Sequence, residues 1–416
     1  MKWVSLMKSA SNLGRVLQEA AQEVRSRLDS EEPDFGLVFF GADYRDDILD
    51  IWPTVRKELR IKHLLGCTAG GVIGGGHEVE EQPALSVTAA VLPNVKISSF
   101  QFQQENLPDA DQGPKAWRDL VACEPADNAN FLLLSDPFSL DADALIAGLD
   151  FAFPNSVKVG GLASGGTAPN ENLLFCNERV LSRGVVGVSL SGDISVETVV
   201  AQGCRPIGHP LSITSSEGNV LISVNNQSPL EYLQDLYGSL DEGDQQLLQN
   251  SLFLGILMDP FKSDPKQGDF LIRNIIGLDQ SKGMMAVGSP LRPGQTVQFH
   301  LRDAHTSHDD LHLMLKKSEA AKFKKAAPPA GAGALLFSCM GRGKRLYGEP
   351  DHDSLLMRSV FGDIPVGGFF CNGEIGPVHG KTYLHGYTSS IAVFAPSKTF
   401  GRARPKSIDN LSSGNF

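Results

Sequence analysis

Cysteine is scarce in this chain of 416 residues, and it follows no pattern. The six cysteines, at positions 67, 123, 176, 204, 339 and 371, are scattered and form no CxxC. This excludes a disulfide framework and favours reduced thiols in a cytoplasm. The N-terminus has no continuous apolar core and no small-residue cleavage site, so secretion is not expected.

Long apolar runs and an excess of positive charge are also missing. No uninterrupted apolar stretch is long enough to span a bilayer. Lys and Arg number 37 against 48 Asp and Glu, which gives a net charge of −11. Nucleic-acid binding needs a concentrated basic face. The sequence therefore predicts a cytoplasmic protein with neither nucleic acid nor membrane as a partner.

The glycine-rich turns lack the motifs that would identify a reaction. Residues 74–82 contain three glycines but neither GxGxxG nor GxxxxGK[ST], so we interpret them as a turn and not as a phosphate site. Ser164 lies in LASGG, which is not the GxSxG of a hydrolase nucleophile elbow. Cys204 and His209 are close in sequence, yet a catalytic pair needs a spatial contact and an orienting group. We interpret their segment as a turn between strands.

Three histidines at HxxHxxxH spacing raise the question of a metal. On a helix, His305, His308 and His312 would share one face, as metal ligands can. Asp309 and Asp310 occur where acidic residues often begin a helix, and lysines follow on the same segment. We therefore predict a solvated helix, with neither a metal nor another cofactor.

What the sequence does contain is an internal repeat. Hydrophobic content is 41% and there are 43 glycines, which fits a globular α/β protein with many tight turns. An apolar run, a helical segment, a second apolar run and a glycine-rich turn occur three times. A spacing of 95 residues aligns Leu37 with Leu132 and Gly66 with Gly161, and GFFCNG from Gly368 matches the third time. We predict a mixed α/β fold of repeated strand–helix–strand units, with mixed sheets covered by helices.

The length exceeds what one ordinary core supports, so we expect several segments. Apolar residues recur at helical spacing over 13–28, and Ser228 with Pro229 begins another helix after the best boundary. AAPPAGAG at 326–333 is interpreted as a linker. The predicted segments are an amphipathic N-terminal helix at 1–29, an N-terminal domain at 30–224, a C-terminal domain at 225–396, and a basic disordered tail at 397–416.

Polar side chains gather where two predicted strands of the last repeat end. Residues 334–337 lead into SCMGRG, and residues 364–370 lead into CNGEIGP. In sheets with helical crossovers, ligands usually bind at such strand ends. We therefore predict a ligand site, shared by the turns of the three repeats around one hollow, that includes Cys339, Arg342, Cys371, Asn372, Glu374 and, from the first repeat, Cys67.

These side chains allow more than one chemistry. Arg342 suits a carboxylate or phosphate, because its planar fork makes two charge-assisted hydrogen bonds. Asn372 and Glu374 would complement an ammonium group, so the set describes an amino acid. Alternatively, Arg342 and Glu374 pair with each other and fix two loops. Cys339 and Cys371 are either small packing residues or, with a thiol pKa lowered by arginine, a nucleophile or redox sensor.

Several blocks of this sequence resemble one known family. FSCMGRG, VGGFFCNGEIGP and LHGYTSSIAVF resemble the C-terminal half of the FIST family, and GCTAGGVIGG, LLLSDPF, VGGLASGG and AQGCRPIG resemble its N-terminal half. The resemblance covers residues 30–395. It implies a small-ligand sensory module that recognises amino acids or similar metabolites and works with signal-transduction partners. Some bacterial relatives are described as haem-dependent gas sensors, and an animal relative carries an F-box.

The sequence and the resemblance together predict a cytoplasmic sensory module that binds an amino-acid-like ligand. About thirty residues precede the first predicted repeat strand, too few for an F-box, so we expect a separate signalling protein as partner. Two alternatives stay open: a cysteine-dependent enzyme or redox sensor that uses Cys339 or Cys371, and a protein-interaction scaffold. The family offers no established catalytic residues to transfer, and none is predicted.

Overall fold

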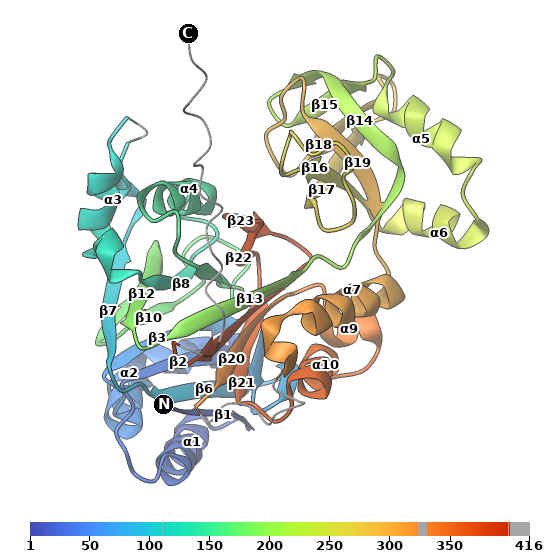
Figure 1. Ribbon diagram of the computed structural model, residues 1–416. Coiled ribbons are helices and arrows are strands. Elements are labelled where there is room, and N and C mark those ends of the chain that lie inside the picture. The colour runs from blue at the N-terminus through green and yellow to red at the C-terminus, as the bar shows by residue number, and fades with distance from the viewer. Residues whose placement is uncertain (110, 323–330, 398, 400–416) are drawn as a thin grey trace.

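Three six-stranded sheets form the body of the protein (Figure 1). The computed structural model describes residues 1–109, 111–322, 331–397 and 399. In sheet order, the first sheet consists of β1 (Lys2–Ser9), β6 (Ala84–Val91), β2 (Phe35–Gly41), β3 (His63–Ala69), β10 (Leu174–Cys176) and β11 (Arg179–Leu181). The second consists of β7 (Val95–Phe102), β12 (Val185–Gly192), β8 (Asn130–Ser135), β9 (Lys158–Leu162), β22 (Glu374–Val378) and β23 (Lys381–His385). The third consists of β13 (Ser195–Ala201), β24 (Ser389–Ala395), β20 (Gly333–Cys339), β21 (Val366–Cys371), β4 (Gly71–Gly74) and β5 (His77–Glu80).

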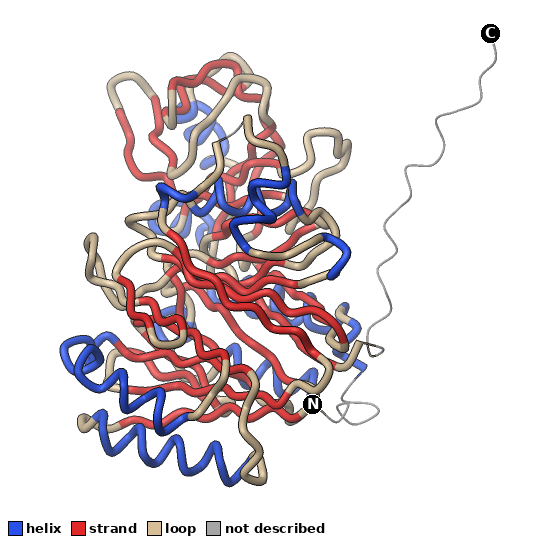
Figure 2. The backbone as a smooth tube through the Cα atoms, turned by 90° about the vertical axis from the view of Figure 1, so that its left-hand side faces the viewer, coloured by secondary structure: helices blue, strands red, loops and turns tan. Residues whose placement is uncertain are grey.

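Helices lie outside these sheets, as Figure 2 shows. Each sheet has an apolar cluster between its outer face and its own helices. The helices of the first sheet are α1 (Leu13–Arg27) and α2 (Arg45–Leu59). Those of the second are α3 (Pro114–Val121) and α4 (Ala142–Ala152), and those of the third are α7 (Ala304–Lys317), α9 (Gly343–Tyr347) and α10 (His352–Phe361). Short 3-10 turns occur at Ala42–Tyr44, Gln104–Asn106, Pro125–Asp127 and Glu319–Lys322.

The predicted strand–helix–strand repeat is confirmed. The strands of the pairs β2–β3, β8–β9 and β20–β21 are parallel, and each pair is connected through at least one helix. The other neighbouring strands are antiparallel. Strands buried on both faces explain runs such as FGLVFF, which do not alternate with polar residues.

The predicted alignment of the repeats is wrong by one residue in the second strand of the second unit. Gly66 lies beside Val38, Gly160 beside Leu133 and Gly368 beside Leu336. At all three glycines an added Cβ would meet the carbonyl oxygen of that neighbour, so the equivalent of Gly66 is Gly160 and not Gly161. Two adjacent glycines in GGLASGG made the two registers indistinguishable in sequence.

Each sheet is completed by a hairpin from another repeat. The β4–β5 hairpin of the first repeat pairs with β21 of the third. The β10–β11 hairpin of the second repeat pairs with β3 of the first, and β22–β23 of the third pairs with β9 of the second. The exchange runs in a closed circle, so no repeat forms its full sheet alone.

The inner faces of the three sheets share one apolar core. Phe39 from the first sheet stacks on Phe369 from the third at a ring-centroid distance of 4.6 Å. Phe337 meets Phe369 edge to face at 5.9 Å, and Leu132 and Leu134 join from the second sheet. The fold therefore brings together residues that are more than 300 positions apart in the chain.

A closed barrel is inserted into the third repeat and stands apart from the sheets (Figure 1). It consists of β14 (Arg205–Glu217), β15 (Val220–Val224), β18 (Met284–Val287), β17 (Phe270–Asp279), β16 (Leu252–Leu257) and β19 (Thr296–Leu301). Helices α5 (Pro229–Tyr237) and α6 (Glu242–Asn250) connect β15 to β16. The predicted division between residues 224 and 225 therefore falls within the barrel, since β14 and β15 precede it and the other four strands follow it.

The N-terminal segment contains a strand that the sequence analysis missed. The predicted amphipathic helix is confirmed as α1, whose buried residues recur at helical spacing. Before it, however, β1 pairs with β6 at the edge of the first sheet, so the segment 1–29 is not a helix alone. The segment KWVSLMKS begins with Lys2 and has Lys8 near its end. These charged residues, which are common on edge strands, made the half-buried strand hard to recognise in the sequence.

Two predicted segments lie partly beyond what the structure describes. Residues 326–330 of the linker, and 398 and 400–416 of the tail, are outside the described residues. Among the helices that are described, none combines the length and apolar character needed to cross a membrane.

The glycines opposite a carbonyl give a test of the repeat architecture. Replacing Gly368 with alanine should lower the free energy of unfolding by about 3 kcal/mol, because φ is +149° and the Cβ would lie 1.8 Å from the Leu336 oxygen. Gly113→Ala is the control, since a Cβ at Gly113 meets nothing within 4 Å. Denaturant unfolding should separate the two variants. Equal stability of both would contradict the close contact.

Candidate functional site

The two strand ends of the third repeat lie side by side, as predicted. Cys339 at the end of β20 is the register partner of Cys371 at the end of β21. The turn after β20 is held by the Met340 N–H, which donates to the Cys371 carbonyl at 3.0 Å. Parallel strands end at the same edge of a sheet, so chemistry from both turns meets there.

The strand ends of all three repeats also converge, but not around a hollow. The Asn372 N–H donates to the Leu162 carbonyl at 3.1 Å, which joins the third repeat to the second. Ser164 Oγ donates to the Phe370 carbonyl and accepts from the Gly70 N–H at 3.0 Å. A Cβ on Gly161 would lie 2.4 Å from Cys371 Sγ. The predicted common hollow is filled by backbone and small side chains.

Three of the predicted site residues lie outside any polar cluster. Cys67 and Cys371 are fully buried in the shared apolar core, and burial raises the pKa of both thiols well above the usual value. Asn372 is exposed. Cys67 is the structural equivalent of Phe369 and not of Cys371, so it does not occupy the strand end that matches Cys371.

Arg342 is bound by the protein itself. It is fully buried, and its Nε and Nη2 atoms donate to the two carboxylate oxygens of Asp353 at 2.8 and 3.1 Å. Nη2 also donates to the Tyr347 hydroxyl at 2.6 Å. The internal pairing weighed in the sequence analysis therefore exists, but the partner is Asp353 of α10 and not Glu374.

Asp353 collects further donors from three elements. Ser389 Oγ donates to it at 2.6 Å, Ser338 Oγ at 3.2 Å, and His352 Nδ1 lies 2.9 Å away. Burial by itself would raise the pKa of Asp353, but the Arg342 charge and these hydrogen bonds outweigh burial and hold the pKa well below its usual range. The carboxylate is thus ionised and fixes β20, β24 and α10 together.

The histidine motif is divided between the surface and this network. His305 is exposed and lies 3.4 Å from Asp309 on the same helix. His308 Nδ1 lies 3.0 Å from His352 Nε2, and the His352 ring stacks on Tyr347 with centroids 3.4 Å apart. His308 therefore links the surface of α7 to the buried ion pair.

Glu374 is buried without an ion pair. Its Oε2 accepts the Thr388 N–H at 3.2 Å, while Oε1 has no hydrogen-bond partner among the described residues. Burial raises the pKa of this carboxyl group well above the usual value, more than the nearby Arg342 and Arg302 charges lower it. Burial therefore favours the protonated form of the Glu374 carboxyl group.

Arg302 and Tyr387 complete the cluster, and the sequence analysis missed both. Arg302 follows β19 and is 8% exposed, and its Nη2 donates to the Gly341 carbonyl at 3.1 Å. The guanidinium lies over the Tyr387 ring at 5.1 Å, and Tyr387 in turn packs on Phe253 of the barrel. The expectation that ligands bind at strand ends could have identified Arg302, because Arg302 directly follows the apolar strand β19.

The accessible edge of the cluster is the turn at Gly341. A Cβ there would lie 3.2 Å from Arg302 Nη1, 3.8 Å from Cys339 Sγ and 4.0 Å from the Tyr387 ring. Cys339, Gly341 and Tyr387 are all half-buried, so small molecules can approach this point from solvent. The cluster lies where barrel and third sheet meet, and such junctions are frequent ligand sites.

Cys339 is not an activated thiol. Burial, together with the Glu374 carboxyl, raises its pKa to about 11, although Arg302 and the Gly341 N–H act in the opposite direction. Reactive cysteines have lowered pKa values. The geometry therefore disfavours the nucleophile and redox-sensor alternatives.

With this geometry established, the chain can be compared with known proteins. The FIST N domain matches residues 34–227 and the FIST C domain matches residues 229–377. The chain belongs to the FIST family. FIST domains are regarded as sensory or signal-transduction modules, so the resemblance noted from the sequence blocks is confirmed at the level of the family.

Relatives of this FIST protein extend over nearly its whole length. An uncharacterised protein of Mycobacterium tuberculosis strain H37Rv is 35% identical over 388 residues, which is 93% of this chain and 98% of the relative. An uncharacterised Mycobacterium bovis protein is 35% identical over 379 residues, 90% and 94% of the two chains. An F-box/LRR-repeat protein of Arabidopsis thaliana is 25% identical over 139 residues, 32% of this chain and 26% of that protein.

Among solved structures, a cyanuric acid hydrolase from A. caulinodans resembles the FIST chain weakly. The TM-score is 0.30 at 9% identity, with 95% of this chain and 99% of the hydrolase covered. At this level of likeness nothing about activity follows.

The Arg342–Asp353 pair predicts a pH-dependent loss of stability. Asp353→Asn should lower the free energy of unfolding by about 3–5 kcal/mol near neutral pH, because it leaves a buried guanidinium without its counter-ion. The folded-state pKa of Asp353 is depressed, so its contribution is present above the unfolded pKa of about 4 and is lost as pH falls below it. Denaturant titrations should show the variant approaching the parent in acid. Asp50→Asn, at an exposed position of α2, is the control and should change little.

The raised pKa of Cys339 predicts slow alkylation. With the pKa at about 11 instead of 9.0, its reaction with iodoacetamide at pH 7.5 should be about 100-fold slower than that of an ordinary cysteine and should accelerate up to pH 10. The other five cysteines are buried and should not compete in the folded protein. Cys339→Ser should remove the labelled product. Rapid labelling of Cys339 at neutral pH would restore the nucleophile hypothesis.

Proposed function

We propose that this protein is a small-ligand-binding sensory module that recognises the carboxylate of an amino acid or similar metabolite at Arg302. One observation carries the proposal. The Arg302 guanidinium is buried, donates one hydrogen bond to a backbone carbonyl, leaves Nε unpartnered, and has no ion pair with any carboxylate in the described part of the chain. A buried charge without a counter-ion is costly, and an anionic ligand would supply that counter-ion.

The surroundings of Arg302 support a carboxylate over other groups. The Arg302 guanidinium lies over the Tyr387 ring at 5.1 Å, a cation–π contact that helps to hold it in place. The Gly341 turn lies close beside it, since a Cβ on Gly341 would be 3.2 Å from Arg302 Nη1. Cys339 is neutral, so it does not repel an anion. Arg342 already has Asp353 as its counter-ion and fixes the turn, so the anchor proposed from sequence moves from Arg342 to Arg302.

The other predicted contacts change accordingly. Burial disfavours the charged form of Glu374 and Asn372 is exposed, so neither is proposed as the partner of a ligand ammonium group. Glu374 remains in the proposed site as a buried carboxyl group near Cys339. The proposed ligand is therefore defined by its carboxylate, and amino acids are one class of such ligands.

The position of the site suggests how binding is transmitted. Both connections between body and barrel pass the cluster, since Arg302 follows β19, and Gly203 precedes β14. The Gly203 N–H donates to Asp310 at 2.9 Å and its carbonyl accepts from Ser307 at 2.9 Å, while a Cβ on Gly203 would lie 2.8 Å from Arg342 Nη1. Ligand binding at Arg302 would change the contacts that hold the barrel against the body of the protein. We infer that a separate cytoplasmic signalling protein detects this change, and the six free thiols support a reducing compartment.

Calorimetry with a panel of amino acids and small dicarboxylates tests the proposal. At least one carboxylate should bind the parent, and Arg302→Gln should weaken that binding about tenfold or more, because a charge-assisted hydrogen bond contributes about 1.5–3 kcal/mol.

Arg292→Gln is the matched control, since Arg292 is exposed on the same barrel and should bind as the parent does. Circular dichroism and Tm establish that the variants are folded. A parent that binds no member of the panel, or an Arg302→Gln variant that binds as tightly as the parent, would refute the assignment.

A further inference from the structure

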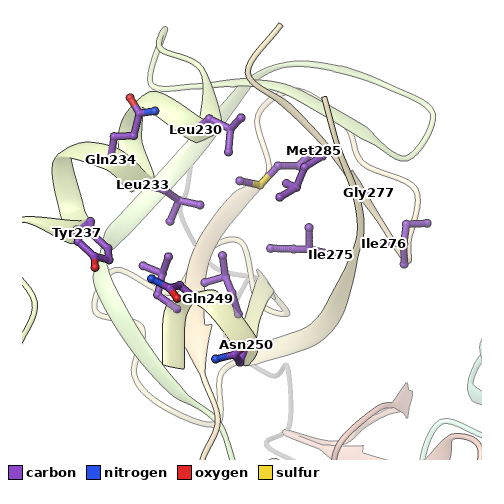
Figure 3. A pocket seen from close by; sticks show the side chains of 13 residues that line it. Leu230, Leu233, Gln234, Tyr237, Gln249, Asn250, Ile275, Ile276, Gly277 and Met285 are labelled. Atoms are coloured by element: carbon purple, nitrogen blue, oxygen red, sulfur yellow. The ribbon is translucent and has the colours of Figure 1, made fainter. Parts of the chain in front are cut away.

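The barrel also carries a pocket that shares no residue with the Arg302 cluster (Figure 3). Its volume is about 660 Å³. Helix α5 forms one wall and the end of α6 another, and strands β17 and β18 form the third. Leu230, Leu233 and Tyr237 occur at helical spacing on α5 and line one face of it.

The lining is apolar and carries no charge. Ile275 of β17 and Leu233 of α5 point into the space between them, and Met285 of β18 lies on the same side of the pocket as Ile275 (Figure 3). Ile276 and Leu278 of β17 also belong to the lining. None of the lining residues is Lys, Arg, Asp, Glu or His. Ile276 is 60% exposed and Leu278 is 53% exposed, although a barrel strand normally turns polar side chains to solvent. The irregular register of β17 against β18 between Ile275 and Gly277 accounts for this outward turn.

Two carboxamides stand at the mouth of the pocket. Gln234 on α5 and Gln249 on α6 belong to the lining, and neither side chain hydrogen bonds to another described residue. Each can donate and accept, so they can orient one polar group of a ligand without requiring a charge. Asn250, by contrast, already donates to the Gln246 carbonyl at 3.1 Å.

Helix α6 covers the barrel only loosely. No residue of α6 is fully buried, although Leu247 and Leu248 point apolar side chains toward the barrel core. A helix of this kind usually buries its apolar stripe. The incomplete contact between α5 and α6 is what leaves the pocket open.

We propose that this pocket, the barrel pocket, is a second ligand site that takes an uncharged small molecule with an apolar body and one hydrogen-bonding group. The volume lies in the range of small-molecule sites, roughly 300–1,000 Å³. Its uncharged lining selects against ions, because a buried charge would lack a partner. An apolar ligand would gain from binding, since this removes apolar surface of both the ligand and the pocket from water.

The concave shape favours a small molecule over a protein surface. Three elements surround the space, and the mobile thioether of Met285 can adjust to different shapes. A second copy of the chain or a partner helix would instead have to insert a side chain between α5 and α6. The experiment below distinguishes these occupants.

The neutral fluorophore N-phenyl-1-naphthylamine is a suitable probe, because its emission rises when it leaves water. The full chain should bind one molecule of the probe with micromolar affinity. Leu278→Asp should weaken this binding at least tenfold, since it places a carboxylate in the apolar wall without disturbing a buried residue. Arg302→Gln should leave it unchanged, which separates this site from the proposed carboxylate site.

Leu313→Asp is the matched control, because Leu313 is a comparably exposed leucine, at 50%, on α7 outside the pocket. It should bind the probe as the parent does. Three results would overturn the proposal: no one-to-one binding by the parent, undiminished binding by Leu278→Asp, or loss of probe binding as the protein is concentrated. The last result would show a second copy in the pocket.

Discussion

The exchange of hairpins between repeats is the constraint on which the structure depends. β4–β5, β10–β11 and β22–β23 each supply the last two strands of a sheet that belongs to another repeat. Backbone groups at a sheet edge need partners, and here each repeat provides them for the next. A single unit would therefore expose both an unpaired edge and the inner apolar face that Phe39, Phe337 and Phe369 close together.

The same exchange builds the polar cluster. Glu80 at the end of β5 accepts the Lys344 N–H at 2.8 Å, and Glu78 accepts the Ser354 N–H at 2.7 Å. A hairpin of the first repeat thus supports the two turns that carry Arg342 and Asp353. Burial raises the pKa of Glu78 to about 8, with Asp353 acting in the same direction. Among Asp353, Glu78 and Glu374 in the described part of the chain, Asp353 alone forms an ion pair with a guanidinium.

Much of the fold could be predicted, because its signals are local. Apolar runs followed by helical segments identified the three units, and helical spacing over 13–28 identified α1. The register of the second strand in the second unit could not be predicted, since the adjacent glycines 160 and 161 fit the pattern equally well and only the position of the Leu133 carbonyl distinguishes them. β1 was missed for a related reason: an edge strand with lysines at its ends shows little alternation.

For the site, the sequence identified turns that come together in the structure, but not the partners of their side chains. Strand ends collect functional groups, and Cys339, Arg342 and Glu374 do lie in one cluster, while ligand binding there stays a prediction. The sequence could not show that Asp353, eleven residues along the chain, would reach back to Arg342, nor that Arg302 would arrive from the barrel. Residue type and strand pattern by themselves determined the repeats, the family and the free thiols. Only the tertiary structure decided which guanidinium is paired and which is left open, because ion pairing depends on distances between elements that the chain folds together from different repeats.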